Sequence, residues 1–145
     1  MSPEEQAERL FAEGRNCAQA VLAAFAPAAG LDEQVALRVA AALGGGVCRT
    51  GATCSAVTGA LMAIGLLLFD PSDAGREAQA RVYAAGALFM ERFAPEHGAR
   101  DCRTLLGEDM GSPEGRQRAR EAGLFRERCP RFVRDAARLV QEVLR

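Results

Sequence analysis

The stretch TGATCSAVTGALMAIGLLLF occupies residues 50–69 and carries no formal charge over its twenty residues. That is about the length that a helix needs to cross a bilayer. Its first half is only weakly apolar, however, and the strongly hydrophobic part, from Leu61 to Phe69, is too short to cross. The pattern therefore favours a buried helix at the centre of a helical bundle, capped at its start by Thr53, and no membrane insertion.

Cap residues and apolar spacing predict further helices on both sides of this central one. The expected caps are, in chain order, Ser2, Asn16, Asp32, Ser72 or Asp73, Asp101, Ser112 and Cys129. The helices that begin at the first four caps are expected to end near Gly14, Phe25, Leu43, and Pro95 or Gly98. Asp101 is expected to begin only a short turn through Leu106, and Ser112 a helix that ends at Gly123. The 29 alanines favour helix over strand, and no stretch shows a strand pattern. We therefore expect an all-α, single-domain bundle of about six helices over residues 1–145.

Composition excludes several classes of function. A net charge of −1 gives no support to a nucleic-acid binder, and the mild excess of arginine after residue 100 is expected to be a solvated face. All 18 basic residues are arginine, so Schiff-base and lysine general-base chemistry is excluded. His97 is the only histidine, which excludes His-rich metal sites and two-histidine mechanisms. Five cysteines remain as the residues able to carry chemistry.

Four of the five cysteines lie at expected helix starts. Cys17, Cys54 and Cys102 directly follow expected caps, and Cys129 is itself the expected cap before Pro130. The first turn of a helix has unpaired N–H groups and the positive end of the helix dipole, which favour a thiolate. This placement favours a functional role for the thiols over packing alone, although free cysteine also packs as a small hydrophobic residue.

The N-terminal sequence indicates the compartment in which the cysteines would act. The acidic N-terminus has no apolar stretch typical of a secretory signal, so we expect a cytoplasmic location. In such a reducing compartment, cysteines are more often catalytic, redox-sensing or metal-binding than structural.

The spacing of the cysteines excludes two common motifs. The chain contains no Cys-x-x-Cys, which excludes a thioredoxin-type motif and a zinc ribbon. Any shared site of these thiols must therefore be assembled by the fold.

Three other residues near the thiols are candidates for a secondary role. His97 lies five positions before Cys102 and could serve as its base or as a ligand beside the thiolates, or it could complement the dipole at a helix end. Arg103 could lower the pKa of the adjacent Cys102 thiol or be a surface residue. Gly59, inside the central helix, indicates close approach of either a neighbouring helix or a ligand.

Blocks of sequence around these cysteines occur in the order found in a known family. They are residues 16–21 around Cys17, the Gly44–Gly46 loop with the Cys54–Ala60 motif after it, residues 97–107 around Cys102, and residues 123–133 around Cys129. The chain thereby resembles the C_GCAxxG_C_C family of predicted redox-active proteins, named for their cysteine pattern. The resemblance covers nearly the whole chain. It implies that Cys17, Cys54, Cys102 and Cys129 form a redox or cofactor centre.

Two positions depart from the family pattern. Ser55 stands where the motif has glycine, directly after Cys54, and Cys48 stands where the family has a small residue. Cys48 is therefore an additional thiol. With five residues between it and Cys54, it is either a local disulfide partner of Cys54 or a bystander.

Three functions follow from these observations, in decreasing order of preference. The first is a thiol-based oxidoreductase that uses pairs of the four cysteines for thiol–disulfide exchange or electron transfer. Its partner would be a redox protein or a small thiol. The second is a four-thiolate site for a metal or an iron–sulfur cluster, formed by Cys17, Cys54, Cys102 and Cys129. The third is a helical interaction module with structural cysteines. Whether a cofactor is bound and whether the chain forms a homo-oligomer stay open at this point.

Overall fold

The computed structural model describes residues 1–73 and 75–145 of the chain. These residues form eight α-helices and one short 3-10 helix, and no strand longer than an isolated bridge. The helices are α1 (Pro3–Ala12), α2 (Cys17–Ala29), α3 (Glu33–Val39), α4 (Ser55–Leu68), α5 (Arg76–His97), α6 (Cys102–Leu106), α7 (Pro113–Glu121) and α8 (Leu124–Val143), and the 3-10 helix spans Ala41–Leu43. The all-α prediction is confirmed. The expected number of about six helices is too low, and the short turn expected from Asp101 to Leu106 is a helix, α6.

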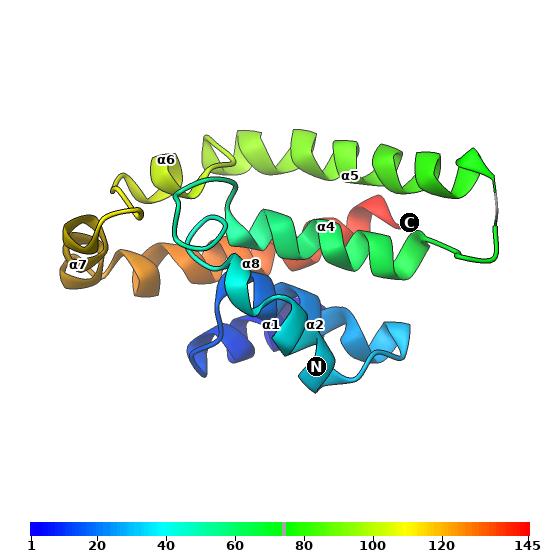
Figure 1. The fold of residues 1–145 in the computed structure, drawn as a ribbon, viewed down its shortest axis with the longest axis horizontal. Helices are drawn as coiled ribbons and strands as arrows, with labels where there is room; N and C mark the ends of the chain where they lie inside the picture. Colours follow the sequence, from blue (N-terminus) through cyan, green and yellow to red (C-terminus); the bar gives the residue numbers. More distant parts are fainter. Residues whose placement is uncertain (74) are drawn as a thin grey trace.

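The uncharged stretch forms the central helix, α4, as predicted. It packs against α2, α5 and α8, and α8 in turn packs against α1, α2 and α5. Figure 1 shows α5 running alongside α4, with α1 and α2 on the opposite side and α6 and α7 at one end. No helix in the described part of the chain is long and apolar enough to cross a membrane.

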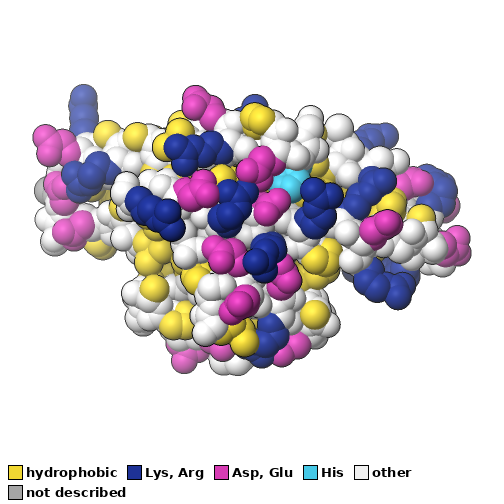
Figure 2. Space-filling view, turned by 180° about the vertical axis from the view of Figure 1, so that it is seen from behind, with side chains coloured by type: hydrophobic (Ala, Val, Ile, Leu, Met, Phe, Trp, Pro, Cys, Tyr) yellow, Lys and Arg dark blue, Asp and Glu magenta, His cyan; other side chains and the backbone are white. Residues whose placement is uncertain are grey.

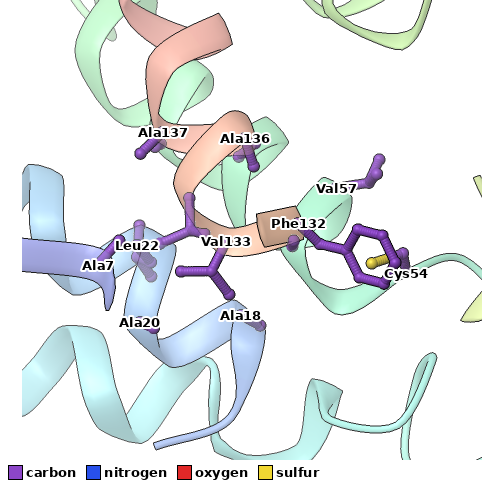
Figure 3. Close-up of a cluster of buried hydrophobic side chains, with 14 of the residues drawn as sticks. Ala7, Ala18, Ala20, Leu22, Cys54, Val57, Phe132, Val133, Ala136 and Ala137 are labelled. Carbon is purple, nitrogen blue, oxygen red and sulfur yellow. The ribbon is translucent and has the colours of Figure 1, made fainter. Parts of the chain in front are cut away.

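Small side chains let the helices around α4 approach closely. In Figure 3, Ala7 of α1 and Leu22 of α2 lie beside Val133 of α8, and Val57 of α4 lies on the side of Phe132; all of these side chains are buried. The many alanines thus form much of the core, where their small size brings helix backbones together while still removing apolar surface from water. Buried core residues run from Ala56 to Ile64 in α4 and from Cys129 to Val140 in α8.

Most of the predicted helix starts are confirmed by their cap geometry. In each, the cap side chain accepts a hydrogen bond from a backbone N–H in the first turn; these caps are Ser2, Asn16, Asp32, Asp101 and Ser112. Two caps differ from the prediction. Cys54 rather than Thr53 is the cap of α4, and Gly75 rather than Ser72 or Asp73 is the cap of α5.

The prediction that Cys129 caps the last helix is wrong. Helix α8 begins at Leu124, so Cys129 is its sixth residue and Pro130 lies in its interior; Pro27 likewise lies inside α2. An interior proline costs about 3 kcal/mol because it removes one backbone hydrogen bond. In α8 the first turn carries Leu124 and Phe125, which pack against the core, and this burial offsets the cost.

Candidate functional site

All five cysteines line a single cavity. The cavity has a volume of about 640 Å³ and lies where the starts of α2, α4 and α6 meet the first part of α8. Cys17, Cys54, Cys102 and Cys129 come from these four helices, and Cys48 comes from the loop before α4. Every one of these thiols is free. The fold therefore brings together cysteines that lie more than a hundred positions apart in the chain.

Close packing of α2 on α4 brings Cys17 to the cavity. A Cβ atom on Gly59 would lie 2.7 Å from the Ala18 carbonyl oxygen and 2.9 Å from its Cα, so only glycine permits this approach. The close neighbour expected at Gly59 is thus the backbone of α2, and Gly59 is not part of the cavity wall. Because Cys17 directly precedes Ala18, the same contact positions Cys17 beside the start of α4.

The start of α2 is held in place by a capping box. The Asn16 side chain accepts a hydrogen bond from the Gln19 N–H at 2.9 Å, and the Gln19 side chain accepts one from the Asn16 N–H at 3.0 Å. Both amide side chains also donate to carbonyls of the next segment, at Ala41 and Leu37. Cys17 therefore occupies the first turn of a helix whose start is fixed on both sides.

A short backbone bridge places Cys54 beside Cys102. Thr53 and Asp101 form an isolated antiparallel bridge. The Cys54 N–H donates to the Arg100 carbonyl at 2.7 Å, and the Cys102 N–H donates to the Ala52 carbonyl at 2.7 Å. The starts of α4 and α6 are thereby joined. No strand pattern in the sequence indicates a bridge this short.

The glycine loop before α4 adopts a left-handed turn that carries Cys48. Residues 45–49 all have φ between 52° and 72°, and three of them, Val47, Cys48 and Arg49, are not glycine. Such a conformation costs an L-residue roughly 1–2 kcal/mol. Gly46 is required here, because a Cβ atom on it would lie 2.7 Å from the Cβ of Cys102. The loop thus packs directly over Cys102 and leaves Cys48 exposed.

Ser55 fastens this loop to the start of α4. Its hydroxyl donates to the Leu43 carbonyl and accepts a hydrogen bond from the Gly46 N–H at 3.2 Å. The side chain is buried, so these bonds satisfy a polar group that would otherwise be costly. The serine that replaces the motif's glycine therefore has a structural role beside Cys54.

Burial outweighs the helix-start effect at two of the thiols. Burial raises the pKa of Cys54 to about 11, although the N–H groups of Ala56 and Val57 oppose this rise by donating to the sulfur. Burial also raises the pKa of Cys102 to about 12, and the nearby Cys54 adds to the rise. The expectation that a helix start makes these two thiols thiolates is therefore wrong, since removal from water disfavours the charged form.

Cys17 and Cys129 influence each other's ionisation. A hydrogen bond between the Cys17 and Cys129 side chains lowers the pKa of Cys129 despite its burial. The same bond, together with burial, raises the pKa of Cys17. Cys129 is thus the thiol whose ionisation is favoured, and the cause is the neighbouring thiol on α2 rather than a helix start.

His97 and Arg103 do not join the cysteines. The His97 ring lies edge-on to Phe132, with 5.0 Å between the ring centres, and its Nε2 lies 3.0 Å from a carboxylate oxygen of Asp135. His97 lines a separate, smaller cavity, and the Phe132 ring lines both cavities. His97 is the last residue of α5, the position expected of a residue that complements the helix dipole. Arg103 is exposed and is absent from the wall of the cysteine cavity.

The thiols are too far apart to hold one metal ion as they stand. A tetrahedral zinc site with Zn–S bonds of about 2.3 Å places its sulfurs about 3.8 Å apart. Among the residues described, the one group of three or more potential ligand atoms within 4.8 Å of one another consists of Glu96, His97 and Asp135. The Glu96 carboxylate is already bound by Arg138, at 2.7 Å. A four-thiolate site for a single ion would require the helix starts to move together.

Four arginines also line the cysteine cavity, and the sequence did not single them out for this role. They are Arg15, Arg49, Arg116 and Arg120. The last two are four residues apart on α7, which places them on one helix face. Sequence spacing could have paired these two with each other, but it could not have shown that they face the thiols.

Comparison with known proteins identifies one family. The family model described as "Putative redox-active protein (C_GCAxxG_C_C)" matches residues 15–143 of the 145 residues. No curated protein and no solved structure matches the chain.

Proposed function

Since the chain belongs to the C_GCAxxG_C_C family, we propose that it is a dithiol–disulfide redox protein whose reacting pair is Cys17 and Cys129. One observation carries the proposal: the four family cysteines line one cavity, and within it Cys17 and Cys129 lie near enough to shift each other's pKa in opposite directions. A pair that shares a proton has one sulfur ready to attack and a second close enough to resolve the product. The other two family thiols, Cys54 and Cys102, line the same cavity, and burial raises their pKa values to about 11 and about 12.

The proposed reaction balances as a two-electron exchange. The Cys129 thiolate attacks one sulfur of a disulfide substrate, the substrate's S–S bond breaks, and the first product leaves as a thiolate that takes up a proton. Cys17 then loses its proton and attacks the Cys129 sulfur of the mixed disulfide. The Cys17–Cys129 bond forms and the second product thiol is released. A dithiol reductant restores the protein, as a reducing compartment such as the cytoplasm would allow.

Counting thiols by residue tests the proposal. Protein oxidised with a small disulfide, denatured and alkylated should show two fewer free thiols than reduced protein, and peptide mapping should join residues 17 and 129. Cys17→Ser should abolish this bond, whereas Cys48→Ser, which changes an exposed thiol on the same cavity, should leave it intact. A disulfide that consistently joins Cys48 to Cys54, or no loss of free thiols at all, would overturn the assignment.

Metal analysis of the same protein tests the alternative. If protein purified without oxygen contained one zinc ion or one iron–sulfur cluster per chain, and if Cys54→Ser and Cys102→Ser removed it, the four-thiolate function would replace the proposal. The separation of the sulfur atoms disfavours a single ion held by all four thiolates, whereas the dithiol reaction needs only Cys17 and Cys129 close together.

A further inference from the structure

The cysteine cavity has a strongly positive lining. Arg15, Arg49, Arg116 and Arg120 line it, and no aspartate or glutamate does. Within the described part of the chain none of these four side chains has a carboxylate within ion-pair distance, and Arg116 donates instead to the Met110 carbonyl at 2.9 Å. Four arginines therefore line one cavity whose wall carries no carboxylate, and the Arg120 guanidinium donates to the Gln117 side chain at 2.9 Å.

Elsewhere on the protein, arginines are paired with acids. Six of them form ion pairs: Arg9, Arg81, Arg92, Arg118, Arg134 and Arg138. Figure 2 shows a face on which arginine and acidic side chains are interspersed. Arg118 offers a close comparison, because it lies on α7 between two cavity arginines yet binds Glu108 at 2.9 Å. The uncompensated charge is thus a property of the cavity rather than of the arginine-rich composition.

The arrangement of charge and thiols suits a particular ligand. Arg15, Arg49 and Arg120 are exposed, whereas Cys54, Cys102 and Cys129 are buried, so the arginines stand on the solvent side of the thiols. Arginine binds carboxylate and phosphate groups with two parallel hydrogen bonds. The first turns of α2 and α4 add partial positive charge at the cavity wall.

We propose that the disulfide reduced in this cavity is a small anionic molecule, whose carboxylates bind the four arginines while its sulfur–sulfur bond meets Cys129. The proposal rests on the dithiol function above and names its substrate class. The cavity of about 640 Å³ lies in the range that holds small molecules rather than a folded partner. In the reaction, two electrons pass from the Cys17 and Cys129 sulfurs to the substrate, which leaves as two anionic thiols.

Three small disulfides of different charge test this inference. Reduced protein is treated at neutral pH and low salt with 3,3′-dithiodipropionate, which is anionic, with bis(2-hydroxyethyl) disulfide, which is neutral, and with cystamine, which is cationic. The rate of Cys17–Cys129 bond formation is divided by the rate at which each reagent oxidises a free neutral thiol. We expect the anionic disulfide to be about ten-fold faster than the neutral one, with cystamine slowest and the differences shrinking at high salt.

Arginine variants test whether the preference for the anionic disulfide comes from the cavity arginines. Arg15→Gln combined with Arg120→Gln should lower the rate with 3,3′-dithiodipropionate towards that of the neutral disulfide. Arg118→Gln, which removes a charge from the same helix but outside the cavity, should leave all three rates unchanged. Equal normalised rates for the three disulfides would overturn the anionic substrate while leaving the dithiol function standing. If none of the three joins Cys17 to Cys129, the dithiol function itself fails, and the substrate assignment fails with it.

Discussion

The contact between Gly59 and Ala18 sets the distance between α2 and α4, and Gly59→Ala perturbs it directly. The added Cβ would lie 2.7 Å from the Ala18 carbonyl oxygen and 2.9 Å from its Cα. Both are backbone atoms, so the helices must move apart. Alanine gains about 1 kcal/mol in helix propensity, whereas overpacking costs about 1–3 kcal/mol and a backbone clash belongs near the upper end. We expect the variant to lose about 1–2 kcal/mol of unfolding free energy.

Gly65→Ala in the same helix is the matched control. Nothing lies within 4 Å of the position that its Cβ would occupy, so the variant should gain up to about 1 kcal/mol from propensity alone. The two variants should therefore differ by about 2–3 kcal/mol. With a urea dependence of about 2 kcal/mol per molar for a chain of this size, their midpoints measured by circular dichroism should differ by about 1 M.

The same substitution should also affect the thiol pair. Because Cys17 precedes Ala18, moving α2 away from α4 should weaken the hydrogen bond with Cys17 that lowers the pKa of Cys129. The pH dependence of Cys129 alkylation, followed by mass spectrometry, should shift upwards in Gly59→Ala and stay unchanged in Gly65→Ala. If Gly59→Ala proved as stable as Gly65→Ala and left Cys129 unaffected, close packing at this glycine would not be what assembles the site.

Three further predictions concern the cavity. Burial raises the pKa of Cys54 to about 11, above its value in the unfolded chain. The free energy of unfolding should therefore fall as the pH rises from about 9 to about 11. Cys54→Ala should remove about 2 kcal/mol of that fall, as measured by urea titrations at each pH. Ser55→Ala should lower the unfolding free energy by about 1–2 kcal/mol, because the loop N–H and the Leu43 carbonyl lose their partner; a change below experimental error would contradict this. Cys17→Ala should raise the pKa of Cys129 and slow its alkylation at neutral pH, measured by quantitative peptide mapping, and faster alkylation would refute the coupling.

Local rules predicted most of the helices because their causes are local. A side chain such as Asn16 or Asp101 caps a helix by binding an N–H two or three residues away, so both groups are visible in one short stretch of sequence. The local rule that a proline marks the start of a helix failed at Pro130, which lies inside α8. The half-buried Leu124 and Phe125 ahead of the proline pack against the core, and no local pattern contains that contact.

The candidate site, too, was predicted where its causes are local and mispredicted where they depend on packing. The family pattern in the sequence identified Cys17, Cys54, Cys102 and Cys129, and helix periodicity placed three of them in or beside the first residues of helices. The expectation that helix starts would make them thiolates did not hold at Cys54 and Cys102, because their burial has the opposite and larger effect on the pKa.

Sequence alone specified which residues this protein has available: a helical chain with five thiols, whose only cationic side chains are arginines, apart from one histidine. The tertiary structure decided which thiols meet, which of them ionises most readily, and which arginines face them. The physical reason is that hydrogen bonding, burial and charge act over a few ångströms in space. Cys17 and Cys129 lie more than a hundred positions apart, and only the packing of α2, α4 and α8 brings them within that range.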